Sequence, residues 1–171
     1  MPHPLSVLIV AHGSSRYADA ARPAMEHAGA LRHRFAAVEV GLLAGYPTVA
    51  DALARLPPGP VRVVPFFMED GYFVRSVIPP LLPPHAALGE PVGTHPSVAD
   101  IAAALVPSDA SDLVLIAHGS ARNPGRRLAA HTHTETLRHR FGSARLGFLE
   151  EAPFAADVLR AARGDKVAVV G

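Results

Sequence analysis

The sequence predicts an α/β fold with a parallel sheet, and three observations lead to this prediction. The continuous apolar run at 7–10 is typical of a buried parallel strand, and the largely apolar segments 38–43 and 61–67 are predicted as the second and third strands. Segments of helical composition, 18–35 and 47–56, separate these runs. The second half of the chain repeats the same order. Strands that alternate with helices indicate a parallel sheet whose right-handed crossovers place helices on both faces.

An internal repeat organises the chain. The tetrapeptide Ala-His-Gly-Ser at 11–14 recurs at 117–120, which is an offset of 106 residues. With this offset the alignment of 7–65 runs without a gap, and 21 of its 59 pairs are identical. Self-similarity of this kind indicates duplication of a structural unit. We therefore predict a tandem repeat of two similar lobes, residues 1–106 and 107–171, with the second lobe incomplete.

The second copy has no counterpart of residues 66–106, and the chain ends on an apolar run. In the first copy we predict that this stretch forms a fourth strand at 90–93 and a closing helix at 97–105, with Ile78, Leu81, Ile101 and Leu105 buried. Soluble proteins avoid bare sheet edges. We therefore expect that further C-terminal chain, a homodimer partner or packing of the first copy against the second completes the second lobe, and we favour further chain.

Composition excludes several classes of protein. The formal net charge is +1, without the basic footprint of a nucleic-acid-binding protein. The chain has no cysteine, which excludes disulfides and thiolate metal sites within it. No apolar run reaches transmembrane length, and the first residues lack a signal-type segment. We expect a cytoplasmic protein with neither a nucleic acid nor a membrane as partner.

His12 and His118 are the candidates for chemistry. Each directly follows an apolar strand and precedes a Gly-Ser turn, and open α/β sheets bind ligands at the carboxyl ends of strands. Ser14 and the amides after it can bind an anion at the start of the next helix. The helix dipole there disfavours imidazolium, so the imidazole is expected to be neutral and able to bind a metal or accept a proton. A histidine that only hydrogen-bonds the turn is the structural alternative.

Four short motifs follow the predicted strands in a fixed order. They are Ala-His12-Gly-Ser, Gly-Tyr-Pro47, Pro65-Phe-Phe with Gly-Tyr72, and Pro-Val-Gly-Thr-His95. Together they resemble the CbiX family, the class II chelatases that include sirohydrochlorin cobaltochelatases and ferrochelatases. The resemblance implies a chelatase-like parallel sheet flanked by helices, with the histidine that matches His12 in the active site. It also implies insertion of Co²⁺, Fe²⁺ or sometimes Ni²⁺ into sirohydrochlorin, in cobalamin or sirohaem biosynthesis. The metal is then a substrate, and no tightly bound cofactor is expected.

One departure from this family concerns the loop after the third strand. The family usually has a histidine two residues after the loop glycine and an aspartate four residues later, where this chain has Phe73 and Val77. The second metal ligand or base is then Glu69 or Asp70 in the same loop, unless these two form a solvated pair. Phe73 is expected to pack on a face of the macrocycle or on the core.

Several cationic residues are candidates for binding the substrate. Arg16, Arg75 and Arg122 can pair with its carboxylate arms, with an ordinary surface role as the alternative for each. Other histidines receive no functional role: His131 and His133 are predicted on a helix surface, because residues two apart point away from each other on a helix. His95, between a strand end and a helix start, is expected to cap the helix, with a place on the same rim as His12 as the alternative.

The sequence leaves more than one function open. The first is an enzyme, a lyase that inserts a metal into sirohydrochlorin. The second is a catalytically altered chelatase-like lobe that binds metal or tetrapyrrole as part of a larger protein, which the phenylalanine at position 73 and the incomplete second copy favour. A third, purely structural lobe has less support.

Overall fold

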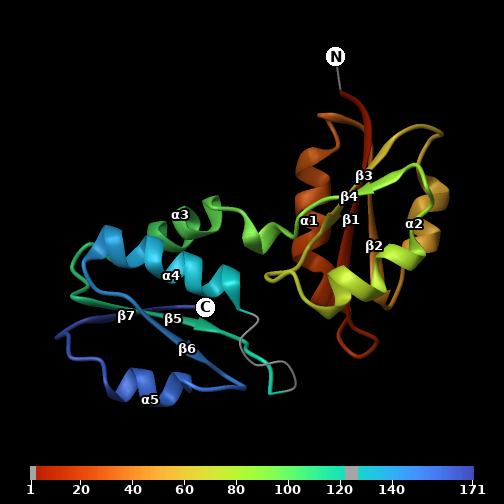
Figure 1. Cartoon of the computed structure of the whole chain (residues 1–171). Helices are drawn as coiled ribbons and strands as arrows, with labels where there is room; N and C mark the ends of the chain where they lie inside the picture. The colour runs from red at the N-terminus through yellow and green to blue at the C-terminus, as the bar shows by residue number, and fades with distance from the viewer. Residues whose placement is uncertain (1–2, 122–126) are drawn as a thin grey trace. The chain divides into compact units, whose positions relative to one another are not determined.

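The computed structural model describes residues 3–121 and 127–171, which fall into two compact units, 1–93 and 94–171 (Figure 1). The first unit has a four-stranded parallel sheet in the order β2-β1-β3-β4. Its strands are β1 (His3–Gly13), β2 (Phe35–Ala44), β3 (Val61–Pro65) and β4 (Ala86–Leu88). Its helical segments are η1 (Ala18–Ala21), α1 (Arg22–Leu31), α2 (Val49–Arg55), the π-helical η2 (Phe73–Val77) and the short 3-10 turns η3 (Pro79–Leu81) and η4 (Val92–Thr94).

The central strand β1 is buried on both faces of the first sheet. Successive side chains of a strand point to opposite faces, and here the two faces belong to separate cores. Val7 and Ile9 pack with the alanines of α1, whereas Leu8 and Val10 pack with α2 and Ile78. Figure 1 shows α1 and α2 on opposite sides of this sheet. Burial on both faces explains why β1 is a continuous apolar run rather than an alternating one.

The second unit has a three-stranded parallel sheet in the order β6-β5-β7. Its core on one face contains residues of α3, α4, β5 and β7, and α5 covers the other face (Figure 1). In the described part of the chain β7 pairs with β5 alone, whereas β3, its counterpart, also pairs with β4. The elements are α3 (Ser97–Ala104), β5 (Asp112–Ala117), α4 (Leu128–Phe141), β6 (Arg145–Phe148), α5 (Ala155–Arg160) and β7 (Val167–Val170).

The predicted repeat is reproduced in the strand register. Leu8 pairs with Glu39 across β1 and β2, and the residues 106 further on, Val114 and Arg145, pair across β5 and β6. The same offset relates the pairing of β1 with β3 to that of β5 with β7. Gly13 and Gly119 after the two histidines have φ of +69° and +75°, a left-handed conformation that favours glycine. His12 and His118 therefore end equivalent central strands, as the sequence predicts.

The prediction for the stretch after β3 is wrong in two respects. The fourth strand lies at Ala86–Leu88 rather than 90–93, because Pro91 has no amide hydrogen with which to continue the ladder. Ile101 and Leu105 are 64% and 67% exposed, since α3 packs through its alanines, and Leu81 is 47% exposed. Ile78 is buried as predicted. The helix α3 also belongs to the second compact unit, so the boundary by contacts comes before the repeat boundary at 106.

The helix predicted at 18–35 is shorter than expected. A 3-10 turn, η1, precedes α1, which ends at Leu31. Phe35 is already the first residue of β2, because it joins the ladder opposite His3. No helix among the described residues is long and apolar enough to cross a membrane.

Gly41 and its counterpart Gly147 allow a helix to approach the sheet closely. A Cβ at Gly41 would lie 2.7 Å from the Cα of Val49, and one at Gly147 would lie 2.7 Å from the Cα of Ala155.

Gly41→Ala is expected to lower the free energy of unfolding by about 1–3 kcal/mol, because α2 must move away from β2. Urea unfolding followed by circular dichroism measures this. The matched control is Gly29→Ala in α1, where nothing lies within 4 Å of the added methyl group and helix propensity predicts a gain of about 1 kcal/mol. Equal stability of the two variants would contradict the close approach.

Asp112 is buried at the amino end of β5 and fully engaged there. Its carboxylate accepts hydrogen bonds from the Ser143 hydroxyl at 2.7 Å and from the Leu113 amide at 3.0 Å, and it forms an ion pair with Arg145. Burial alone would raise the pKa of this carboxyl, but the Ser143 hydroxyl, the Arg145 charge and backbone amides together lower it below its ordinary value of 3.8.

This lowered pKa sets the sign of a pH dependence. A carboxyl with a lower pKa in the folded state adds stability that is present above its ordinary pKa and is lost as the pH falls through the folded pKa. Asp112→Asn is therefore expected to lower the free energy of unfolding at pH 7 by about 1–3 kcal/mol. The difference between the two proteins should shrink below pH 3.8. Urea unfolding at pH 7, 5 and 3 measures it, and a difference independent of pH would contradict this assignment.

Candidate functional site

The ring of His12 is held at the carboxyl end of β1. Its Nδ1 lies 2.9 Å from the carbonyl oxygen of Gly13, and the residue is exposed. A carbonyl oxygen only accepts hydrogen bonds, so we assign the proton of the neutral ring to Nδ1. The lone pair then resides on Nε2. In the tautomer that donates from Nδ1, His12 presents Nε2 as the nitrogen that can bind a metal or accept a proton.

Phe73 lies directly beside His12. Their ring centroids are 4.8 Å apart and nearly perpendicular, at 86°. Phe67 and Tyr72 lie on the other sides of Phe73, with centroids at 6.0 and 5.6 Å. Phe73 remains 36% exposed, so it contacts the neighbouring rings and still presents a surface to a ligand. The structure therefore brings together two of the predicted site residues, His12 and Phe73.

The acidic residues of the loop after β3 differ in their surroundings. Asp70 receives two nitrogens of Arg75, Nη2 at 2.7 Å and Nε at 2.9 Å. The hydrogen bond and the charge of Asp70 raise the pKa of Arg75. Asp70 is thus committed to an ion pair with Arg75. Within 3–121 and 127–171, no group of three or more His, Asp or Glu residues is gathered as a metal site.

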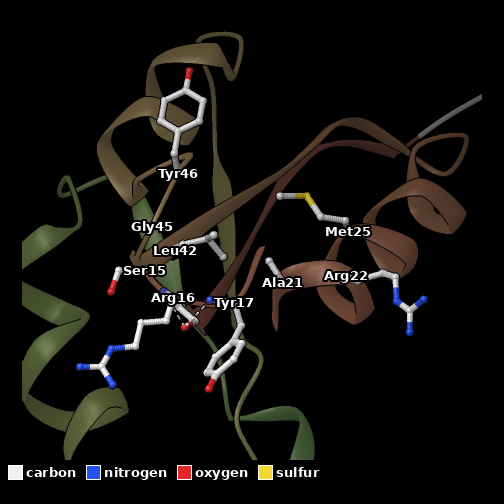
Figure 2. A pocket seen from close by; sticks show the side chains of 10 residues that line it. Ser15, Arg16, Tyr17, Ala21, Arg22, Met25, Leu42, Gly45 and Tyr46 are labelled. Carbon is white, nitrogen blue, oxygen red and sulfur yellow. Dashed lines mark hydrogen bonds between the residues drawn. The ribbon is translucent and has the colours of Figure 1, made fainter. Parts of the chain in front are cut away.

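A cleft of about 610 Å³ opens beside the loop that follows β1. Ser14 shapes this loop, because its hydroxyl oxygen accepts hydrogen bonds from the amides of Arg16 and Tyr17, both at 3.1 Å. Figure 2 shows Arg16 and Arg22 on opposite sides of the cleft, with their guanidinium groups pointing away from each other. The lining residues are Ser14, Ser15, Arg16, Tyr17, Ala21, Arg22, Met25, Leu42, Gly45 and Tyr46. The lining carries positive charge and no carboxylate. Arg122 lies outside the described residues.

In the second unit His118 is accompanied by a carboxylate that the sequence analysis missed. The His118 Nε2 lies 3.4 Å from Oε1 of Glu150, and the amide of Glu150 donates to the carbonyl oxygen of His118 at 3.0 Å. Both side chains are more than half exposed. An imidazole nitrogen and a carboxylate oxygen are common ligands of divalent metals. Glu150 follows β6, the neighbour of β5, and this adjacency of strand ends is the signal that could have found it.

A second carboxylate, Glu151, is buried beside this pair. Its Oε1 lies 2.6 Å from Nε of Arg127 and accepts a hydrogen bond from the Ser120 amide at 3.1 Å. Arg127 and Glu151 are each 8% exposed. The ion pair between Arg127 and Glu151, with the Ser120 amide, therefore joins the loop after β5, the start of α4 and the loop after β6.

Three further histidines have other surroundings, and the ring centroid of His131 lies 6.0 Å from that of Phe148. His95 caps a helix as expected, since its Nδ1 accepts a hydrogen bond from the Ser97 amide at 3.2 Å. His131 is exposed on α4, but the prediction that His133 lies on the surface is wrong, because it is only 5% exposed. The helix α4 is covered along the face that carries His133 and Leu137, and a spacing argument within α4 could not reveal which face that is.

Comparisons with known proteins agree with this architecture. The profile of the CbiX family matches residues 6–108. A probable sirohydrochlorin cobaltochelatase of Halobacterium salinarum is 28% identical, over 96% of this chain and 70% of its own length.

Among solved structures, that of CbiX, the terminal enzyme for biosynthesis of siroheme in denitrifying bacteria, has a TM-score of 0.70 and 28% identity. The match covers 96% of this chain and 77% of that one. DR2241 from Deinococcus radiodurans, a multi-domain protein with structural similarity to chelatases, has a TM-score of 0.79 and 24% identity. That match covers 97% of this chain, which spans only 43% of the Deinococcus protein. The predicted chelatase-like α/β fold is confirmed.

The proximity of Phe73 to His12 leads to a prediction about metal binding. Phe73→His would place a second imidazole where the phenyl ring now lies, with its centroid about 4.8 Å from that of His12. Two imidazoles at this spacing can bind one metal ion, so the Co²⁺ affinity is expected to rise about tenfold or more, or about 1.4 kcal/mol. Isothermal titration calorimetry measures it. Tyr72→His, one position away, is the control and should leave the affinity unchanged; an equal gain in both variants would argue against a shared site.

Proposed function

The chain belongs to the CbiX family of sirohydrochlorin chelatases, and from this premise we propose that it inserts Co²⁺ or Fe²⁺ into sirohydrochlorin. The observation that carries the proposal is the contact of 3.4 Å between His118 Nε2 and Glu150 Oε1 at the carboxyl end of β5. An imidazole and a carboxylate supply one nitrogen and one oxygen donor to a divalent metal. Two protein ligands hold the ion less tightly than a closed four-ligand site, which suits an ion that must be passed on.

His12 supplies the chemistry that insertion also needs. Binding of a divalent metal by the macrocycle releases two pyrrole N–H protons. The Nε2 lone pair of His12 is accessible, and the Nδ1 hydrogen bond to Gly13 keeps the ring in that tautomer. We propose that His12 accepts a proton or holds the metal near the ring nitrogens, with Glu69 as a further candidate ligand in the same unit. His12 and His118 are the proposed catalytic residues.

The first unit also offers groups suited to a flat, acidic macrocycle. Phe73 presents an exposed aromatic ring beside His12, which can pack on one face of a tetrapyrrole. Arg16 and Ser14 line the adjacent cleft, and Arg16 can pair with a carboxylate arm of the substrate. Arg75 is a weaker candidate than Arg16, since Asp70 already engages its guanidinium group.

A second function is favoured by Phe73. An aromatic ring next to His12 removes the chance of a histidine pair in the first unit. The chain would then bind metal or tetrapyrrole as part of a larger protein without turnover. The two functions differ in one observable, the rate of metal insertion above the spontaneous rate.

Replacement of the two strand-end histidines tests the proposal. Incubation of sirohydrochlorin with Co²⁺ or Fe²⁺ and the protein is expected to give the absorbance spectrum of the metallated product faster than without protein. His12→Ala and His118→Ala are each expected to lower the rate at least about 100-fold, the range that a positioned acid–base group contributes. His131→Ala, exposed on α4, is the control and should keep the rate.

The outcomes separate the alternatives. Metal binding without acceleration would favour the binding protein over the enzyme. Unchanged rates and unchanged Co²⁺ affinity in both histidine variants would refute the proposed roles. The initial rates with Co²⁺ and Fe²⁺ decide which metal the protein prefers.

A further inference from the structure

We propose that Glu151, held by Arg127, is a positioning residue that fixes Glu150 beside His118, so that both face one divalent metal ion. This inference rests on the proposed function of the His118–Glu150 pair. Glu151 does not touch the metal in this proposal; it acts through its neighbour in the chain and through the loop that carries His118.

The contacts of Glu151 reach both loops that carry the proposed ligands. Its carboxylate accepts the amide hydrogen of Ser120, two residues after His118, at 3.1 Å. The same oxygen lies 2.6 Å from Nε of Arg127, and both side chains are almost fully buried. Because Glu150 and Glu151 are consecutive, fixing the second side chain fixes the backbone from which the first one projects.

Gly119 gives Glu151 the space to lie there. A Cβ at Gly119 would lie 3.0 Å from Cγ of Glu151 and 3.2 Å from its Oε1, and the φ of Gly119 is +75°. The glycine between His118 and Ser120 therefore serves two purposes. It turns the chain after the strand, and it lets the Glu151 side chain pass close to the backbone.

The first unit has the same strand register but lacks the counterpart of the ion pair between Arg127 and Glu151. The offset of 106 residues matches Arg127 with Ala21, Glu151 with Gly45 and Glu150 with Ala44. Ala21 and Gly45 line the open cleft of the first unit. The proposed metal-binding carboxylate and the ion pair that would position it thus occur together in the second copy and are both absent from the matching positions of the first. Their joint occurrence points to a shared role.

Stability alone gives little reason to bury this pair. Removing two charges from water costs several kcal/mol, and well-packed apolar residues of similar volume are often as stabilising or more so. The first copy has small apolar or glycine residues at the two positions and forms the same sheet register. What the ion pair adds is a fixed direction, since a guanidinium and a backbone amide together define where the carboxylate lies.

The experiment compares Glu151 with Asp112, a second buried carboxylate in the same unit, at the amino end of β5. Glu151→Ala removes the contacts with Arg127 and with the Ser120 amide. Glu151→Gln keeps an oxygen that can accept from Ser120, and Asp112→Asn disrupts the buried pair at the opposite end of β5. Co²⁺ affinity is measured by isothermal titration calorimetry on the full chain, and stability by urea unfolding. We expect Glu151→Ala to weaken Co²⁺ binding about 10- to 100-fold, as loss of a supporting contact to a metal ligand typically does. Glu151→Gln should retain more affinity than Glu151→Ala, and Asp112→Asn should lose stability but keep the wild-type affinity.

Glu150→Gln separates failure of this inference from failure of the metal site. Loss of Co²⁺ binding in Glu150→Gln with wild-type affinity in both Glu151 variants would overturn the positioning role and leave the site intact. Wild-type affinity in Glu150→Gln would overturn the site itself and the positioning role with it. Equal loss of affinity in Asp112→Asn and the Glu151 variants would mean that Glu151 acts only through stability, which also overturns the proposal.

Discussion

The backbone hydrogen bonds between each central strand and its two neighbours determine where the candidate residues at the strand ends, His12, His118 and Glu150, lie. In a parallel sheet the carboxyl ends of neighbouring strands meet at one edge, so a residue that ends β5 lies beside the residues that follow β6. The pairing of Ala117 with Phe148 continues as bonds from the Leu149 and Glu150 amides to Ala117 and His118. A one-residue slip would turn these side chains to the opposite face. The contact between His118 and Glu150 is thus a consequence of sheet register.

The two copies share this strand register, but the residues at the carboxyl ends of their strands differ in chemistry. In the first unit the histidine meets aromatic rings, and the cleft beside the following loop is lined by two arginines together with small, aromatic and aliphatic residues. In the second unit the histidine meets one carboxylate, and a buried ion pair occupies the positions that match two residues of the cleft. An apolar surface suits the face of a macrocycle, whereas nitrogen and carboxylate donors suit a metal ion. The divergence is therefore consistent with different tasks for the two copies.

The fold and the positions of His12 and His118 at strand ends can be predicted because the repeat and the apolar strands are visible in the residue order itself. Ala-His-Gly-Ser recurs at a fixed offset, and the strand before each copy is uniformly apolar, so no tertiary information is required. Glu150 could not be found from the repeat, which matches it with Ala44, and its role depends on which strand lies next to β5. The burial of His133 depends on which face of α4 meets the sheet, and α4 has little amphipathic contrast to reveal it. Both Glu150 and His133 could be interpreted only once the strand order and the helix packing were known, because their residue types do not reveal their neighbours.

The donor set also limits how this protein can select a metal. With no cysteine in the chain, the ligands it can offer are nitrogen and oxygen atoms. For such sites the affinity follows a general order in which Co²⁺ exceeds Fe²⁺, whichever protein supplies them. Affinity at a pair such as His118 and Glu150 therefore favours cobalt slightly and cannot by itself favour iron. Selection of iron would have to come from the supply of the metal or from the geometry at the macrocycle, where the four ring nitrogens impose their own spacing. In the proposed reaction the His118–Glu150 pair could therefore serve either metal without a change in ligands, and a preference would have to be encoded in the residues proposed to contact the macrocycle, Phe73 and the lining of the cleft.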